Sequence, residues 1–163
     1  MLERVREERF PRESALSDWE SFRESHQLQL SRIELGEVVE HGGDQEGCGM
    51  PVDYVVKPVD ATTIDLDLFS MFPDVGQRSV YLYASIHTPE SQQIEMSLGV
   101  DDGVVIWLND RLVEEFPGPQ PFTPNQHKVS VQLAKGENRF CFRVDDIGGA
   151  WRIQVRFSPL LLQ

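Results

Sequence analysis

From residue 32 onward, apolar side chains recur at every second position of the chain. In residues 79–86 the positions of one face are all apolar: Val80, Leu82, Ala84 and Ile86. Tyr81 and Tyr83 alternate with them. Successive side chains of a strand point to opposite faces, so a period of two predicts β-strands that bury one face.

The same period, or a short continuous apolar run, predicts about nine strands. They cover residues 32–40, 52–57, 63–69, 79–86, 94–100, 103–108, 128–133, 139–144 and 151–157. Turns rich in Gly, Pro and Asp separate them. Many short strands joined by such turns are typical of an all-β sandwich or barrel of antiparallel strands.

The first 31 residues differ from the rest. Residues 1–13 alternate Arg and Glu without an apolar face, which is typical of a leader or linker. Ser17 and Glu20 have the spacing of a helix capping box, and Trp19, Phe22 and His26 follow on one helical stripe. We therefore predict a charged leader and a short N-terminal helix in 1–31, and a β-sandwich in 32–163.

The charge and hydropathy of the chain argue against nucleic acid as a partner and against a membrane span. The 163 residues carry a formal net charge of −12, which argues against nucleic acid, since phosphate binding needs a basic surface. No apolar run approaches the ~18 residues of a membrane span, and the charged start lacks a secretory signal. A full-length chain would then be cytoplasmic. Cys48 and Cys141 are read as free thiols or as one long-range disulfide.

Three motifs in the second half of the chain resemble the galactose-binding-like jelly-roll modules. A strand ends in Trp107, Leu108, Asn109 and then Asp110, where the family has Gly. A Gly-x-Asn follows at residues 136–138, and a closing Gly-Gly-x-Trp at residues 148–151. The resemblance covers residues 60–157 well and 32–59 loosely.

Such modules include the sugar-binding domain of family 2 glycoside hydrolases and related accessory modules of bacterial enzymes. The resemblance implies an antiparallel jelly-roll sandwich and a non-catalytic accessory module that binds carbohydrate beside a catalytic domain or in a larger assembly. The alternative is a structural or protein-interaction domain without sugar affinity. A small hydrolase is a third hypothesis, although the sequence has no nucleophile elbow, Walker loop or dinucleotide fingerprint.

Asp101, Asp102 and Gly103 separate two predicted strands and allow two interpretations. Paired carboxylates suit a hard cation, so Asp101 and Asp102 are candidate ligands of a structural calcium ion. No further acidic ladder follows them, and Asp-Gly is also a common turn sequence. Asp145 and Asp146 likewise form either an acid–base pair or a solvated loop.

The last two predicted strands suggest a ligand face. If residues 139–144 and 151–157 pair as a hairpin, four arginines share its outer side: Arg139, Arg143, Arg152 and Arg156. Arg suits bidentate contact with the carboxylates or sulfates of an acidic glycan or a neighbouring domain; the alternative is a solvated face. Phe122, in a proline-rich loop, and Trp151 are candidate stacking platforms, whereas Trp107 is expected in the core.

A glycine-rich loop offers a second, weaker candidate for a metal site. It contains His41, Asp44, Glu46 and Cys48, but their spacing matches no zinc pattern.

Overall fold

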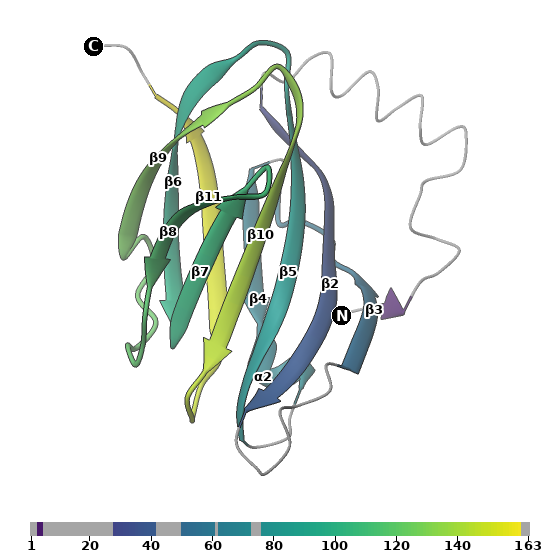
Figure 1. Cartoon of the computed structure of the whole chain (residues 1–163), viewed down its shortest axis with the longest axis vertical. Coiled ribbons are helices and arrows are strands. Elements are labelled where there is room, and N and C mark those ends of the chain that lie inside the picture. Colours follow the sequence, from purple (N-terminus) through teal and green to yellow (C-terminus); the bar gives the residue numbers. More distant parts are fainter. Residues whose placement is uncertain (1–2, 5–27, 42–49, 61, 73–75, 161–163) are drawn as a thin grey trace.

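The computed structural model describes residues 3–4, 28–41, 50–60, 62–72 and 76–160, and these form two packed antiparallel sheets (Figure 1). The large sheet has seven strands in the order β1 (Glu3–Arg4), β3 (Met50–Val55), β2 (Gln29–His41), β5 (Gln77–Thr88), β10 (Gly136–Asp146), β7 (Gly103–Leu108) and β8 (Arg111–Phe116). The small sheet has four, in the order β4 (Thr63–Asp67), β11 (Arg152–Pro159), β6 (Gln92–Asp101) and β9 (His127–Leu133).

The eight strands from β4 to β11 have the strand order of a jelly roll. Among these eight strands the chain crosses between the sheets after β4, β5, β6, β8, β9 and β10, and β7 and β8 alone follow one another within a sheet. β2 and β3 extend the large sheet beyond β5, and β1 pairs with β3. The predicted all-β sandwich is therefore confirmed.

The core lies between the sheets and contains the faces that the alternation predicted. In β10 and β11 the inward side chains are almost completely buried: Phe140, Phe142, Val144, Ile153, Val155 and Phe157. Burying such a side chain contributes roughly 1.5–3 kcal/mol relative to leaving it exposed. Alternation thus assigns the buried faces of β10 and β11 correctly.

Two local predictions differ from the structure. β8 was not predicted, because five of its six side chains are polar or only half-buried and it closes the edge of the large sheet. Trp107 was expected in the core because residues 103–108 read as apolar on both faces. It lies outside the core cluster and pairs across β7 and β10 with Cys141, on the outer face of the large sheet.

The predicted N-terminal helix falls outside the described residues. The helix that the structure describes is α2 (Leu68–Met71), a single turn after β4 that is capped by the Asp67 side chain. No helix within the described residues has the length and apolar character needed to cross a membrane.

Candidate functional site: an acidic corner at one end of the sandwich

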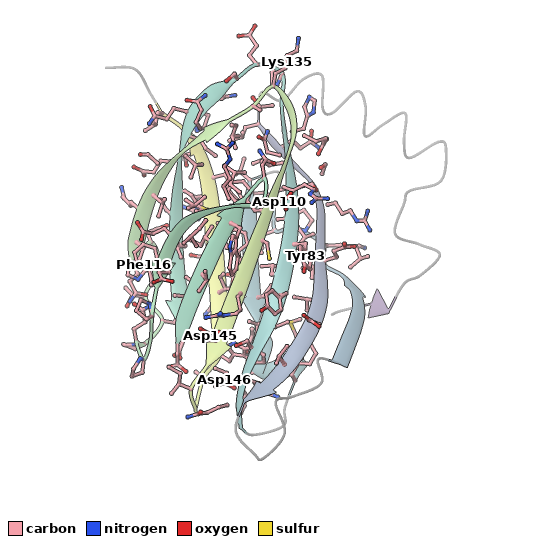
Figure 2. The ribbon with its side chains drawn as sticks, viewed as in Figure 1. Tyr83, Asp110, Phe116, Lys135, Asp145 and Asp146 are labelled. Atoms are coloured by element: carbon pink, nitrogen blue, oxygen red, sulfur yellow. The ribbon has the colours of Figure 1, made fainter. Side chains whose placement is uncertain are left out.

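Three aspartates gather where β6 turns into β7 and where β10 ends. Asp101 is the last residue of β6, Asp102 connects it to β7, and Asp146 ends β10. We call these three residues the acidic corner. Figure 2 shows Asp145 and Asp146 at this end of β10. All three members of the acidic corner are buried, so their charges are only partly screened by water.

The β8–β9 connection, residues 117–126, packs directly on this corner. A Cβ atom at Gly99 of β6 would lie 2.2 Å from the Thr123 carbonyl oxygen, and one at Gly118 would lie 2.8 Å from the Cβ atom of Asp102. Real Cβ atoms do not approach so closely, so both positions need glycine. The proline-rich connection and Asp102 together line a hollow of about 240 Å³, which Asp101, Gln120 and Gly148 also border.

Asp101 is electrostatically the most perturbed of the three. Its pKa is raised to about 6, chiefly by burial and then by the hydrogen bond and charge of Asp102 and the charge of Asp146, while the Phe122 backbone N–H donates to its carboxylate and opposes these effects. An acid crowded by other acids in a dry site resists ionisation. A cation or a hydrogen-bond donor placed in the hollow would therefore stabilise the ionised form.

Asp102 and Asp146 hold the β10–β11 connection in place. The Ile147 backbone N–H donates to Asp102 Oδ2 at 2.6 Å, and the Gly148 N–H donates to Asp146 Oδ1 at 3.0 Å. The Asp102 N–H donates in turn to the Asp145 carbonyl at 2.9 Å. These three hydrogen bonds join the β6–β7 corner and the β10–β11 connection into one ordered unit.

Arg78, at the start of β5, forms a buried ion pair with Asp146 of the acidic corner. Its Nε lies 3.2 Å from Asp146 Oδ2, and the two side chains are only 5% and 3% exposed. The guanidinium also donates to the Phe72 carbonyl and lies 4.6 Å from the centre of the Trp151 ring. Arg78 therefore pairs with Asp146, and Asp101 and Asp102 remain the two acids of the corner without a basic partner among the described residues.

On the small-sheet side, Phe122 anchors the β8–β9 connection beneath an arginine. The Arg152 guanidinium lies 4.3 Å from the centre of the Phe122 ring. It donates to both carboxylate oxygens of Asp65 at 3.0 Å, and Gln154 donates to the same carboxylate at 3.0 Å. This arrangement ties Phe122, which follows the hollow-lining Pro121 in the chain, to β11 and β4.

The far end of the same connection is held by an aromatic pair. The rings of Phe116 and His127 stack with centroids 3.8 Å apart, and burial lowers the pKa of His127. His127 Nε2 lies 2.9 Å from Gln120 Oε1, which also accepts from Gln126 at 2.7 Å. The Gln120 Nε2 atom is shielded from solvent and has no partner among the described residues, although Gln120 borders the hollow.

The predicted arginine face is wrong, because β10 and β11 do not pair. β10 lies between β5 and β7 in the large sheet, whereas β11 lies between β4 and β6 in the small sheet. Arg139 and Arg143 are therefore on the outer face of one sheet, and Arg152 and Arg156 on that of the other. The jelly-roll crossover separates strands that are adjacent in the chain.

The two predicted stacking platforms are also not available as expected. Trp151 is completely buried and contacts Phe72 and Arg78, so its ring has no surface for a sugar. Phe122 is half-buried, and Arg152 covers one face of its ring. Cys141 is a free thiol, whose pKa burial raises to about 11.

Side-chain ligands alone do not make a metal site in the part of the chain that the structure describes. It contains no group of three or more His, Cys, Asp or Glu side chains arranged around one ion. Asp101 and Asp102 would have to be completed by other oxygen ligands, and the other residues that line the hollow are Pro119, Gln120, Pro121 and Gly148. The loop candidates Asp44, Glu46 and Cys48 lie outside the described residues, as does the side chain of His41.

Sequence reasoning missed Arg78 and Gln120. Arg78 precedes a predicted strand and has no distinctive neighbours in the sequence, and only the pairing of β5 with β10 brings it to Asp146. Gln120 stands in the same proline-rich loop as Phe122. The three prolines of residues 117–121 were the available signal for a stiff connection.

Comparisons with known proteins concern the fold. No protein-family model matches the sequence, and no curated protein matches it. The chain is similar to two structures of a β-glucosidase from Kluyveromyces marxianus. One, with selenomethionine, has a TM-score of 0.54 at 16% identity; the other, in complex with glucose, has 0.51 at 15%. Each alignment covers 80% of this chain but 17% of the β-glucosidase chain.

A PA14 sugar-binding domain from an RTX adhesin aligns with 88% of this chain and 77% of its own, at 15% identity and a TM-score of 0.45. At identities this low, the solved structures with TM-scores above 0.5 establish a shared β-sandwich fold. The chain is thus a β-sandwich of a fold that also occurs within a β-glucosidase.

Proposed function

We propose that this β-sandwich is a non-catalytic carbohydrate-binding module and that its ligand binds at the acidic corner. The observation that carries the proposal is the pair Asp101 and Asp102, set side by side over a hollow of about 240 Å³. The hollow is walled by a proline-stiffened connection that two close backbone contacts hold in place. Preformed hollows with a few convergent polar groups are typical ligand sites.

Carbohydrate is the ligand class that this chemistry favours. Sugar hydroxyls are donors, and two adjacent carboxylates with limited hydration are strong acceptors. The fold supports the same choice, since one of the structures that share it is a β-glucosidase in complex with glucose. The resemblance to galactose-binding-like modules belongs to the same proposal.

A calcium ion would fit the corner as a bridge between protein and sugar. Burial and the neighbouring acids raise the pKa of Asp101, and a divalent cation would offset that repulsion. Calcium takes six to eight oxygen ligands, so backbone carbonyls and sugar hydroxyls would have to complete the set that Asp101 and Asp102 begin. Asp146, the third carboxylate of the acidic corner, pairs with Arg78 and has a structural role in this proposal rather than that of a calcium ligand.

The test is direct binding of a glycan panel, followed by calorimetry, in calcium and in EDTA. Asp102→Asn removes one carboxylate without changing the side-chain volume and is expected to lower affinity by about 10-fold or more, since a hydrogen bond to a charged group is worth roughly 1.5–3 kcal/mol. Glu90→Gln makes the same chemical change in the exposed β5–β6 turn, at the opposite end of the sandwich, and serves as the control.

Three results bear on the proposal. Sugar binding that Asp102→Asn weakens and Glu90→Gln leaves unchanged supports it. Binding that both variants retain would place the ligand elsewhere. Absence of binding to any glycan, with a protein partner captured instead, would favour the alternative of an interaction domain. Calcium has its own readout, a rise in Tm that EDTA reverses and that Asp101→Asn abolishes.

A further inference from the structure

The outer face of the large sheet carries a second hollow, of about 290 Å³, that crosses β2, β5 and β10. Strand register places its residues in two rows. Arg32, Ser85 and Arg139 form one row, so the small serine lies between two arginines. Glu34, Tyr83 and Cys141 form the next. We call this hollow the trough; Arg32, Glu34, Tyr83, Ser85 and Arg139 line it, and Cys141 lies beside Tyr83 outside the lining.

Tyr83 is an exposed aromatic residue on a rigid central strand. Its side chain is 41% exposed, and Figure 2 shows it on β5, away from both ends of the sandwich. A Cβ atom at Gly36 of β2 would lie 2.3 Å from ring atom Cε2, so the ring packs directly on the glycine backbone. Its hydroxyl also contacts the Cys141 thiol. The ring is held in place while part of its surface faces solvent.

Opposite charges are paired around this ring. Arg32 Nη2 lies 2.6 Å from Glu34 Oε2, and Arg139 Nη2 lies 3.5 Å from Asp110 Oδ1. The trough therefore presents donors beside acceptors with little net charge. In a chain with a formal net charge of −12, long-range repulsion also disfavours an anionic ligand. The arrangement favours a neutral molecule with many hydroxyl groups.

We propose that this trough is a second saccharide site, in which a neutral pyranose ring packs on Tyr83 and its hydroxyls bond to Ser85, Arg139 and Glu34. Aromatic side chains give large apolar contact at low entropic cost, and a guanidinium beside a carboxylate matches a pair of vicinal hydroxyls. The inference shares its ligand class with the proposed function but not its residues. Because the sites share no residue, Asp102→Asn and Tyr83→Ala test them separately.

The experiment measures binding of neutral hexasaccharides of glucose, mannose, xylose and galactose to the full chain by calorimetry and by NMR shift mapping. An acidic hexagalacturonate is the comparison ligand. Asp102→Asn is used as the background, so that binding at the acidic corner is weakened. In that background Tyr83→Ala is expected to lower the remaining affinity about 10-fold, which corresponds to losing one well-packed ring.

Tyr83→Phe is the matched control for Tyr83→Ala, and Arg156→Ala is the matched control for Arg139→Ala. Tyr83→Phe keeps the ring and is expected to stay within about 2-fold of the background, because packing and not the hydroxyl supplies most of the contact. Arg139→Ala is expected to weaken binding, whereas Arg156→Ala removes an exposed arginine from the opposite sheet and is expected to change nothing. Equal Tm values for Tyr83→Ala and the background exclude unfolding as the cause.

Several outcomes would overturn the inference. One is loss of all hexasaccharide binding in Asp102→Asn alone, which would leave the proposed function standing. Others are unchanged affinity in Tyr83→Ala, and binding of hexagalacturonate in preference to every neutral chain. If wild type binds no neutral saccharide at all, the proposed function and the inference both fail.

Discussion

The two ends of the sandwich bury polar groups in opposite ways. At the end marked by Lys135 in Figure 2, the buried Asn138 amide is fully paired. It accepts from the Ala134 N–H and from Asn109, and it donates to the carbonyls of Ala134 and Gly136, at 2.8–3.2 Å. At the other end the acidic corner has three carboxylates and one buried arginine. A balanced neutral network only stabilises a turn, whereas an unbalanced charged one can receive a ligand.

The largest expected effect comes from the charged end. Arg78→Met leaves Asp146 buried without its partner and is expected to cost about 3–5 kcal/mol of unfolding free energy, measured by urea denaturation. The double variant Arg78→Met with Asp146→Asn removes the stranded charge and should recover a large part of that loss. If the double variant is as unstable as Arg78→Met, packing on Trp151 matters more than the ion pair.

A substitution at the neutral end, around Asn138, should lower the free energy of unfolding somewhat less. Asn138→Ala removes four hydrogen bonds from a buried turn and leaves two backbone groups of Ala134 without partners, so we expect a loss of about 2–3 kcal/mol. Sugar affinity should not change, which distinguishes this end from the acidic corner. A loss of affinity comparable to that of Asp102→Asn would show that the two ends are not separate in function.

Asp101→Asn should stabilise the ligand-free protein. The folded pKa of Asp101 is about 6 against an ordinary value of 3.8, so the folded state binds more protons than the unfolded state between these values. The free energy of unfolding contributed by this group therefore falls as pH rises through that window. In EDTA we expect a gain of about 1–2 kcal/mol at pH 7, roughly 2–8 °C in Tm, and almost none near pH 4.

The same variant sharpens the comparison of the ends. A gain in stability combined with a loss of sugar or calcium binding is the signature of a site held in an unfavourable state for function. If Asp101→Asn is destabilising at pH 7, the carboxylate is needed by the fold, and the acidic corner would resemble the Asn138 turn more than a binding site.

The smallest effect on stability is expected at Arg152, which packs on Phe122 of the β8–β9 connection. Arg152 is partly exposed, and its ion pair with Asp65 is accessible to solvent, so Arg152→Ala should cost at most about 1 kcal/mol and less at high salt. Arg156→Ala, on the same strand, should cost nothing measurable. A larger, salt-independent loss at Arg152 would indicate that its packing on Phe122 holds the β8–β9 connection.

Period-two alternation predicted most of the strands and their buried faces, because burial depends on each strand alone, but it missed the exposed edge strand β8 and the outward position of Trp107. It could not predict neighbours. β10 and β11 are adjacent in the chain, and the hairpin expected of them placed Arg139 and Arg152 on one face, but the jelly roll assigns them to different sheets. Alternation placed Trp151 on the inward face of its strand, whereas the site prediction treated it as an exposed stacking platform. The structure buries Trp151, in agreement with the alternation.

The candidate site was predicted only in pieces. Asp101, Asp102 and the proline-rich stretch each stood out in the sequence, but their contact depends on Gly99 and Gly118, whose need for glycine appears only when the connection packs on β6. Arg78 and Tyr83 have ordinary sequence surroundings. Strand pairing alone brings Arg78 to Asp146 and sets Tyr83 beside Gly36 and Cys141.

The β8–β9 connection joins the free edge of the large sheet to the free edge of the small one. The edge strands of two packed sheets separate most readily where no chain segment joins them, and this connection joins them at that edge. Because the same connection borders the acidic corner, a bound sugar would oppose local separation of the two sheets. Amide hydrogen exchange in β8 and β9 should therefore be slower with bound saccharide than without it, because the ligand would link the edges of the two sheets.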